Sequence, residues 1–237
     1  MPKYKKDQTT SYCLGTTLTL EALNFKAKEM QRIYVSPKQK RDDTYRKIVG
    51  ICKEKGIPVI ENNEKIFREL SEKDNCMVLG EFNKFSSSLR KEKNHVVLVN
   101  PSNLGNLGTI FRSCFGFYLE DVALITPCAD AFDPKTVRAS MGAIFHLNLA
   151  LFPDFASYQR AFPEHHPYPF MLQAKTLLKD AEIEAPWSLV FGNEAKGLDP
   201  SFLNVGSPLI IPQNKGLDSL NLDNAVSIGL YEFSRNR

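Results

Sequence analysis

The fold of this chain can be inferred from one segment, His95-Val-Val-Leu-Val-Asn-Pro-Ser-Asn-Leu-Gly-Asn-Leu-Gly-Thr-Ile-Phe-Arg112. Residues 95–99 form an apolar run of the kind that a parallel sheet buries on both faces. The Gly and Asn residues that follow indicate a turn, and the remainder indicates a helix that carries Arg112. Gly105 and Gly108 let the backbone approach a ligand or take positive φ. Because the G-x-G-x-x-G spacing is absent, a Rossmann nicotinamide site is disfavoured.

Downstream of this segment, strand and helix patterns keep alternating. Further strands are predicted within 119–126, 168–172, 188–191 and 209–211. The last segment is an amphipathic helix in which apolar and small residues recur at helical spacing, namely Leu222, Ala225, Val226, Gly229, Leu230 and Phe233. The alternation predicts an α/β fold with a mostly parallel, helix-covered sheet.

The chain before His95 reads as a smaller unit. Short helix and strand patterns over residues 11–82 predict a small α/β sandwich, and the polar, Ser-rich stretch after it predicts a linker. We therefore expect one domain at 1–82, a linker at 83–94 and a second domain at 95–237.

Charge is distributed unevenly between the two parts. Residues 1–93 hold 20 Lys and Arg against 13 Asp and Glu, a net charge of +7, whereas residues 94–237 hold 10 against 14, a net charge of −4. A basic first part favours a module that grips a polyanion, although a solvated Lys-rich surface explains the charge equally well.

Composition argues against several other classes of protein. No run approaches the roughly 20 apolar residues of a membrane span, and the basic N-terminus lacks the apolar stretch of a signal peptide, so we expect a cytoplasmic protein without a membrane partner. The five cysteines form no C-x-x-C pair and the four histidines form no H-E-x-x-H, so we expect neither a disulfide framework nor a metal site. Cys114, within the predicted helix, is expected to be a buried, reduced thiol.

Two polar residues stand out in the first segment. Asn106 can cap the helix or bond a polar ligand. Arg112 lies among apolar neighbours and favours an anionic partner, such as a phosphate or a carboxylate. A structural salt bridge is the alternative for Arg112.

Two later segments place polar residues beside glycines. In Trp187–Leu198 an apolar strand runs into Gly192, Glu194 and Gly197, at the strand end where open α/β sheets bind ligands. The alternative for Glu194 is that it accepts hydrogen bonds from backbone amides. In the second of these segments, Pro208–Asn221, either Ser219 or Asn221 would cap the last helix.

In order and spacing, these three segments resemble motifs 1, 2 and 3 of the SpoU branch of the SPOUT methyltransferases. The family pattern Asn-x-Gly-x-x-x-Arg is matched by Asn106, Gly108 and Arg112. The pattern Phe-Gly-x-Glu-x-x-Gly is matched by Phe191, Gly192, Glu194 and Gly197. The pattern Ile-Pro followed by Ser-Leu-Asn is matched by Ile211, Pro212, Ser219, Leu220 and Asn221. The match covers about 96–235, and the first part resembles the ribosomal-protein-like RNA-binding domain often fused ahead of this one.

The resemblance implies a homodimeric enzyme that binds S-adenosylmethionine in a trefoil knot and methylates the ribose 2′-hydroxyl of ribosomal or transfer RNA, with ribosomal RNA slightly favoured. It implies that Arg112, Asn106, Glu194, Ser219 and Asn221 shape the catalytic site. It further implies that the donor is held around Gln173, Gly192, Gly197, Ile211 and Leu220. Because guanidinium groups stay protonated throughout the physiological range, Arg112 is better suited to organise ribose and phosphate than to act as a base.

The rival interpretation is a catalytically silent RNA-binding protein that keeps the knot as a scaffold. Departures from the family pattern at Ala195, Gln213, Asp223 and Asn224 lie beside the main polar residues and do not remove them. A silent relative has no chemical reason to keep Arg112, Glu194 and Ser219–Asn221 together.

Overall fold

The computed structural model describes residues 4–61, 63–70, 76–214 and 216–235, and its contacts divide the chain into two compact units. The first unit contains residues up to Phe85 together with Asp130–His146, and the second contains Ser86–Ala129 and everything from Leu147 onward. This division differs from the one expected from sequence, because a segment between two strands of the second unit packs with the first.

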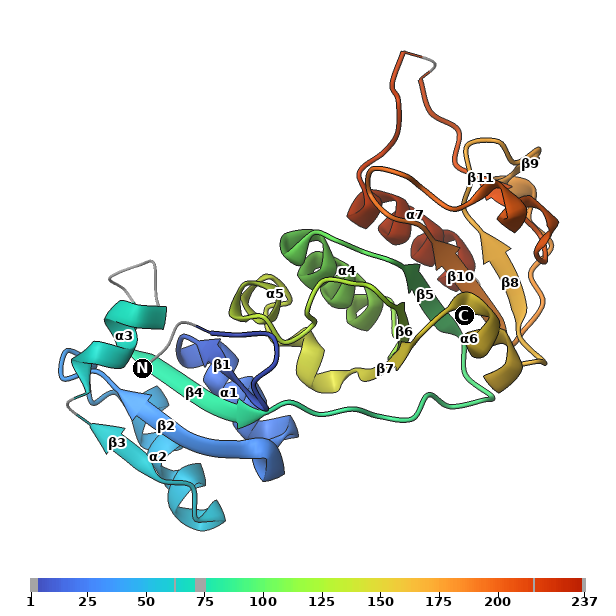
Figure 1. Cartoon of the computed structure of the whole chain (residues 1–237). Coiled ribbons are helices and arrows are strands. Elements are labelled where there is room, and N and C mark those ends of the chain that lie inside the picture. Colours follow the sequence, from blue (N-terminus) through green and yellow to red (C-terminus); the bar gives the residue numbers. More distant parts are fainter. Residues whose placement is uncertain (1–3, 62, 71–75, 215, 236–237) are drawn as a thin grey trace. The chain divides into compact units, whose positions relative to one another are not determined.

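The first unit is built on a four-stranded sheet, formed by the blue and cyan strands in Figure 1. The strand order is β1-β4-β2-β3, in which only the β2–β3 pair is parallel. Its strands are β1 (Thr10–Leu14), β2 (Met30–Val35), β3 (Val59–Glu61) and β4 (Val78–Asn83). Its helices are α1 (Thr16–Phe25), α2 (Asp43–Lys55), α3 (Glu64–Leu70) and α5 (Pro134–Ala139), with short 3-10 turns at Ala27–Glu29 and Ala143–His146.

Residues 130–146 complete the core of the first unit. Ring contacts join Phe82 of β4 to Phe132 and Phe145, with centroid distances of 6.3 and 5.4 Å. The Ser11 hydroxyl of β1 donates to the Phe132 carbonyl. The Lys84 ammonium also lies 3.1 Å from the carboxylate of Asp130. The α/β sandwich predicted for the front of the chain therefore includes a segment from much later in the sequence.

The second unit is a parallel five-stranded sheet of order β7-β6-β5-β10-β8. The α/β fold with a parallel sheet is thus as predicted. The strands are β5 (His95–Val99), β6 (Asp121–Ile125), β7 (Asn148–Phe152), β8 (His166–Pro169) and β10 (Trp187–Phe191). The helices are α4 (Leu104–Gly116), α6 (Phe155–Ala161) and α7 (Leu222–Ser234), with 3-10 turns at Leu178–Asp180 and Pro200–Asn204. The strand predicted at 209–211 is β11 (Leu209–Ile210), which pairs with β9 (Thr176–Leu177) in a separate two-stranded sheet.

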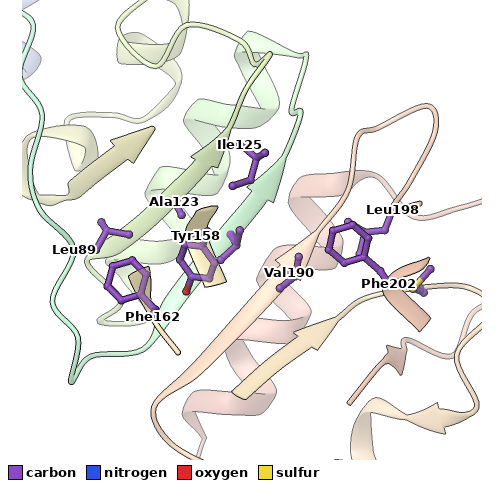
Figure 2. Close-up of a cluster of buried hydrophobic side chains, with 10 residues drawn as sticks. Leu89, Ala123, Ile125, Tyr158, Phe162, Val190, Leu198 and Phe202 are labelled. Atoms are coloured by element: carbon purple, nitrogen blue, oxygen red, sulfur yellow. The ribbon is translucent and has the colours of Figure 1, made fainter. Parts of the chain in front are cut away.

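Both faces of the five-stranded sheet are covered. Alternating strand residues such as Val97 and Val190 face a buried cluster that includes Tyr158 of α6 and Phe162, which directly follows this helix, drawn in Figure 2. On the other face, Phe233 of α7 contacts Trp187 at a centroid distance of 5.2 Å. Cys114 is fully buried and free, as predicted.

The segment expected to be a linker is largely attached to other parts of the chain. Strand β4 extends through Asn83, and Leu89 is buried in the cluster of Figure 2. The Arg90 guanidinium binds the buried carboxylate of Asp121. The lack of sequence periodicity in residues 83–94 therefore reflects an irregular backbone that packs against other parts of the chain, and not a free linker.

Candidate functional site

A pocket of about 300 Å³ lies in the second unit, beside the carboxyl ends of β8 and β10. Its apolar wall includes Phe170 and Phe191, whose rings stack at a centroid distance of 4.3 Å. Polar side chains line the rest, among them Lys196 and Asp218. An apolar wall with a few polar groups is the usual composition of a small-molecule site.

The pocket brings together seven of the ten residues singled out by sequence. All five residues expected to hold the donor line it, namely Gln173, Gly192, Gly197, Ile211 and Leu220. Glu194 and Ser219, expected in the catalytic set, line it as well. Asn106, Arg112 and Asn221 do not belong to its lining.

The turn after β10 requires glycine at its first position. A Cβ atom added to Gly192 would lie 2.2 Å from the Gly197 carbonyl carbon and 2.3 Å from the Leu198 nitrogen. Gly197 has a φ of 69°, in the left-handed region. The two glycines therefore let residues 192–198 close tightly on themselves against the pocket.

Glu194 binds the loop that precedes α4. Its carboxylate accepts from the Ser102 amide at 2.9 Å, the Ser102 hydroxyl at 2.8 Å and the Asn103 amide at 3.0 Å. Partial burial alone would raise the pKa of Glu194, but these hydrogen bonds outweigh it and the pKa is lowered. Glu194 is therefore an ionised cross-link between two loops, and it is poorly suited to accept a proton.

Helix α4 is capped by a residue that sequence reasoning did not single out. The Asn103 side chain accepts from the amides of Gly105 and Asn106 at 2.8 and 3.0 Å. Asn106 therefore lies in the first turn and is not the cap. Its side chain donates to the Asn221 side-chain oxygen at 3.2 Å.

Asn221 is the N-cap of α7, accepting from the Leu222 amide at 3.0 Å, so of the two predicted caps it is Asn221 and not Ser219. The Asn106–Asn221 bond joins the first and third sequence segments. Helices α4 and α7 are joined again by the Ser113 and Ser227 hydroxyls, which lie 2.8 Å apart.

Arg112 is exposed on α4. Within the described part of the chain, its guanidinium makes no hydrogen bond or ion pair. The structural salt bridge considered for it is therefore absent from these residues, and the charge remains available to an external anion.

Asn193 is the main residue that sequence reasoning missed. Its side chain donates to the Asn100 carbonyl at 2.9 Å and accepts from the Ala195 and Lys196 amides at 3.0 and 3.1 Å. An Asn shortly after a strand is a common turn signal that could have drawn attention to Asn193, but it does not reveal the bond to Asn100.

No group of three or more His, Cys, Asp or Glu in the described ranges is arranged to hold a metal ion. No helix among the described residues is long and apolar enough to cross a membrane.

Comparisons with known proteins match both parts of the chain. The model of the SpoU rRNA Methylase family matches residues 93–231, and a model described as RNA 2′-O ribose methyltransferase substrate binding matches residues 12–86. Mouse mitochondrial rRNA methyltransferase 3 is 31% identical over 187 residues, covering 57% of this chain and 45% of that protein. The 23S rRNA (uridine(2479)-2′-O)-methyltransferase of Streptomyces viridochromogenes is 29% identical over 154 residues, covering 60% and 52%. The chain thus spans about half the length of the curated relatives it matches.

Solved structures match over nearly the whole chain. The AdoMet-bound rRNA methyltransferase from Sinorhizobium meliloti has a TM-score of 0.82 and 27% identity, covering 96% of this chain and 88% of that one. The SpoU methyltransferase AviRb from Streptomyces viridochromogenes, in complex with AdoMet, has a TM-score of 0.86 and 20% identity, covering 97% and 91%. The second likeness concerns the fold alone.

Proposed function

This chain belongs to the SpoU rRNA methylase family, and from that premise we propose that it transfers a methyl group from S-adenosylmethionine to a ribose 2′-hydroxyl of structured RNA. The observation that carries the proposal is the pocket, which gathers residues of the second and third sequence segments and whose Glu194 binds the loop that begins the Arg112 helix. The trefoil knot stays a prediction of the family resemblance.

The pocket residues fit the proposed donor. The Phe170 ring, which stacks on the buried Phe191 ring, and the side chain of Ile211 offer apolar surface for an adenosyl group. Lys196 and Asp218, both exposed at the pocket, offer opposite charges for the amino-acid end. When bound, the donor supplies an electrophilic methyl group.

Arg112 is proposed to organise the acceptor. A ribose hydroxyl is a weak nucleophile at neutral pH, so it must be aligned and must lose its proton. An exposed guanidinium without an internal partner among the described residues can hold a substrate phosphate bidentately and orient the adjacent ribose. Glu194 holds the loop at the start of the same helix.

We propose ribosomal RNA as the substrate, with transfer RNA as the second candidate. Relatives from mouse and Streptomyces are named as ribosomal RNA methyltransferases. The match of residues 12–86 to a substrate-binding model supports a role for the first unit in holding RNA. A cytoplasmic location stays a prediction.

A homodimer is proposed through α4 and α7. Large apolar side chains are exposed on α7 and at the carboxyl end of α4, namely Phe115, Tyr118, Ile228 and Tyr231. Tyr118 is 83% exposed and Tyr231 is 60% exposed, and large apolar patches of this kind mark protein interfaces. Sedimentation of a Tyr118→Lys, Tyr231→Lys variant as a monomer would support this face, and an unchanged dimer would exclude it.

The function is tested by incubating the protein with labelled methyl donor and unmodified RNA. We expect label in ribose 2′-O-methyl groups of ribosomal RNA and donor binding by calorimetry. Label only in transfer RNA would transfer the proposal to that substrate. No label in either RNA, together with no donor binding, would favour the catalytically silent alternative.

Arg112→Ala should lower transfer on the order of 100-fold or more, because phosphate and ribose would no longer be held. Donor affinity should stay within about twofold, because Arg112 does not line the pocket. Arg160→Ala, which removes an exposed arginine from α6, is the matched control and should transfer normally. Near-normal transfer by Arg112→Ala would refute the role given to Arg112.

A further inference from the structure

The Asn193 side chain uses its two ends for two different loops. Its Nδ2 donates to the Asn100 carbonyl at 2.9 Å and to the Ser102 hydroxyl at 3.3 Å, both in the loop between β5 and α4. Its Oδ1 accepts from the Ala195 and Lys196 amides in the turn that lines the pocket. One carboxamide therefore joins the turn of the donor pocket to the loop that begins the Arg112 helix.

The loop that receives this bond has an unusual backbone conformation. Asn100 has a φ of 54°, in the left-handed region that non-glycine residues seldom occupy and that Asn tolerates best. Its amide donates to the Ile125 carbonyl at 3.1 Å and its side chain donates to the Pro127 carbonyl at 3.2 Å. The bond from Asn193 fixes the remaining backbone group of Asn100, its carbonyl.

We infer that Asn193 is a positioning residue, which sets the location of α4 and Arg112 relative to the donor pocket, an inference that rests on the proposed methyl transfer. Glu194 reinforces the same connection through the Ser102 and Asn103 amides. Asn193 acts through Arg112, because the Asn193 amide is occupied by protein groups on both sides. Loss of its donor end should therefore misplace Arg112 while leaving the pocket turn intact.

The Asn193→Asp substitution removes the hydrogen-bond donor of this side chain and keeps the acceptor, so it tests the two ends separately. An aspartate keeps an oxygen for the Ala195 and Lys196 amides, but it cannot donate to the Asn100 carbonyl, and it adds a negative charge close to Glu194. We expect donor affinity by calorimetry within about twofold of wild type. We expect the transfer rate at saturating donor and RNA to fall on the order of tenfold or more, because misplacement of reacting groups lowers the rate of the chemical step.

Asn193→Ala removes both ends and should lower donor affinity as well as the transfer rate. Asn204→Asp is the control, because it makes the same amide-to-carboxylate change at an exposed site in the same unit. That variant should resemble wild type in both measurements. The split between affinity and rate in the aspartate variant, absent from the alanine variant, distinguishes positioning from general destabilisation.

Hydrogen exchange provides a readout that does not depend on activity. Amides of residues 102 and 103 should exchange faster in Asn193→Asp, while those of 195 and 196 keep their wild-type protection. A wild-type transfer rate at saturating donor in either Asn193 variant, or unchanged exchange at 102 and 103, would overturn the inference. Wild-type protein that transfers no methyl group would instead refute the proposed function, and the exchange result would still decide whether Asn193 holds the loop.

Discussion

His95 is an ionisable residue buried completely at the start of β5. Its Nε2 lies 3.0 Å from the Arg90 carbonyl, which can only accept, so Nε2 carries the hydrogen. Its Nδ1 lies 2.9 Å from the Tyr158 hydroxyl and accepts from it in the neutral ring. Burial, helped by the neighbouring His165, lowers the pKa of His95 to about 4.

This shift predicts an acid-sensitive stability. The unfolded chain binds a proton at His95 near pH 6.5, whereas the folded chain resists it until about pH 4. The stabilisation is therefore complete above pH 6.5 and is lost as the pH falls toward 4, by about 3 kcal/mol. Urea unfolding measured between pH 7 and pH 4 should show this decline.

His95→Gln keeps a donor for the Arg90 carbonyl and removes the titration. Its unfolding free energy should fall less steeply with acid than that of wild type. The remaining slope should include a share from His165, whose pKa burial also lowers. His166→Gln, at a partly exposed site, is the control, and a His95→Gln profile parallel to wild type would contradict a neutral, buried His95.

Among single residues, those with a chemical signature in the sequence were predicted better than those whose role depends on a partner. Gly192 and Ile211 were placed at the donor pocket by motif, and both line it. The partners of Asn193 lie more than 90 positions earlier in the chain or within its own turn. No local pattern reveals such a bond, because the approach of β10 to β5 is a property of the folded sheet.

At the scale of elements, the turn between β10 and the pocket depends on the absence of a side chain. Gly192→Ala should open residues 192–198, because its Cβ would overlap the Gly197 and Leu198 backbone. Donor affinity, measured by calorimetry, should fall on the order of tenfold or more, a loss of about 1.4 kcal/mol.

Gly56→Ala is the control for Gly192→Ala. Gly56 ends α2 with a φ of 67° and has open space around its Cβ position, so alanine there strains only the backbone. It should cost about 1 kcal/mol of stability and leave donor affinity unchanged. Equal donor affinities in the two alanine variants would mean that the tight turn is not needed for binding.

Elements with strong local signals were also predicted well. The strand at 95–99 and the last helix appear within a residue or two of their expected bounds, because an apolar run and a helical stripe identify them. Strands β1 and β7 were not predicted. Both are five residues long, and each gains its place in a sheet from pairing with a strand elsewhere in the chain.

At the scale of the whole molecule, the chain passes between its two units three times, after Phe85, after Ala129 and after His146. The basic front third and the Ser-rich stretch led sequence reasoning to one crossing near residue 90. The other two could not be anticipated, since Phe132 and Phe145 look like ordinary core residues of the second domain until their contacts with Phe82 are known.

Cleavage of the backbone after Phe85 should therefore leave the two fragments associated in one complex. A protease site inserted at Ser86–Ser88, where two of the three serines are exposed, would produce two fragments that still share the core of the first unit. We expect them to elute together in size exclusion and to separate only in denaturant. Separation in native buffer would show that Asp130–His146 holds the first unit weakly, and Phe132→Ala in the cut protein should promote that separation.

The same three passages restrict how such a protein can be recombined. A gene fusion that exchanges residues 1–85 for the corresponding domain of another protein would bring a new sheet without the segment Asp130–His146 that packs against it. Phe132 and Phe145 would then face a sheet to which they are not matched. A viable chimera has to inherit both stretches from one parent. The first unit is thus encoded by two separated stretches of the gene, and the shorter stretch lies inside the part that encodes the second unit.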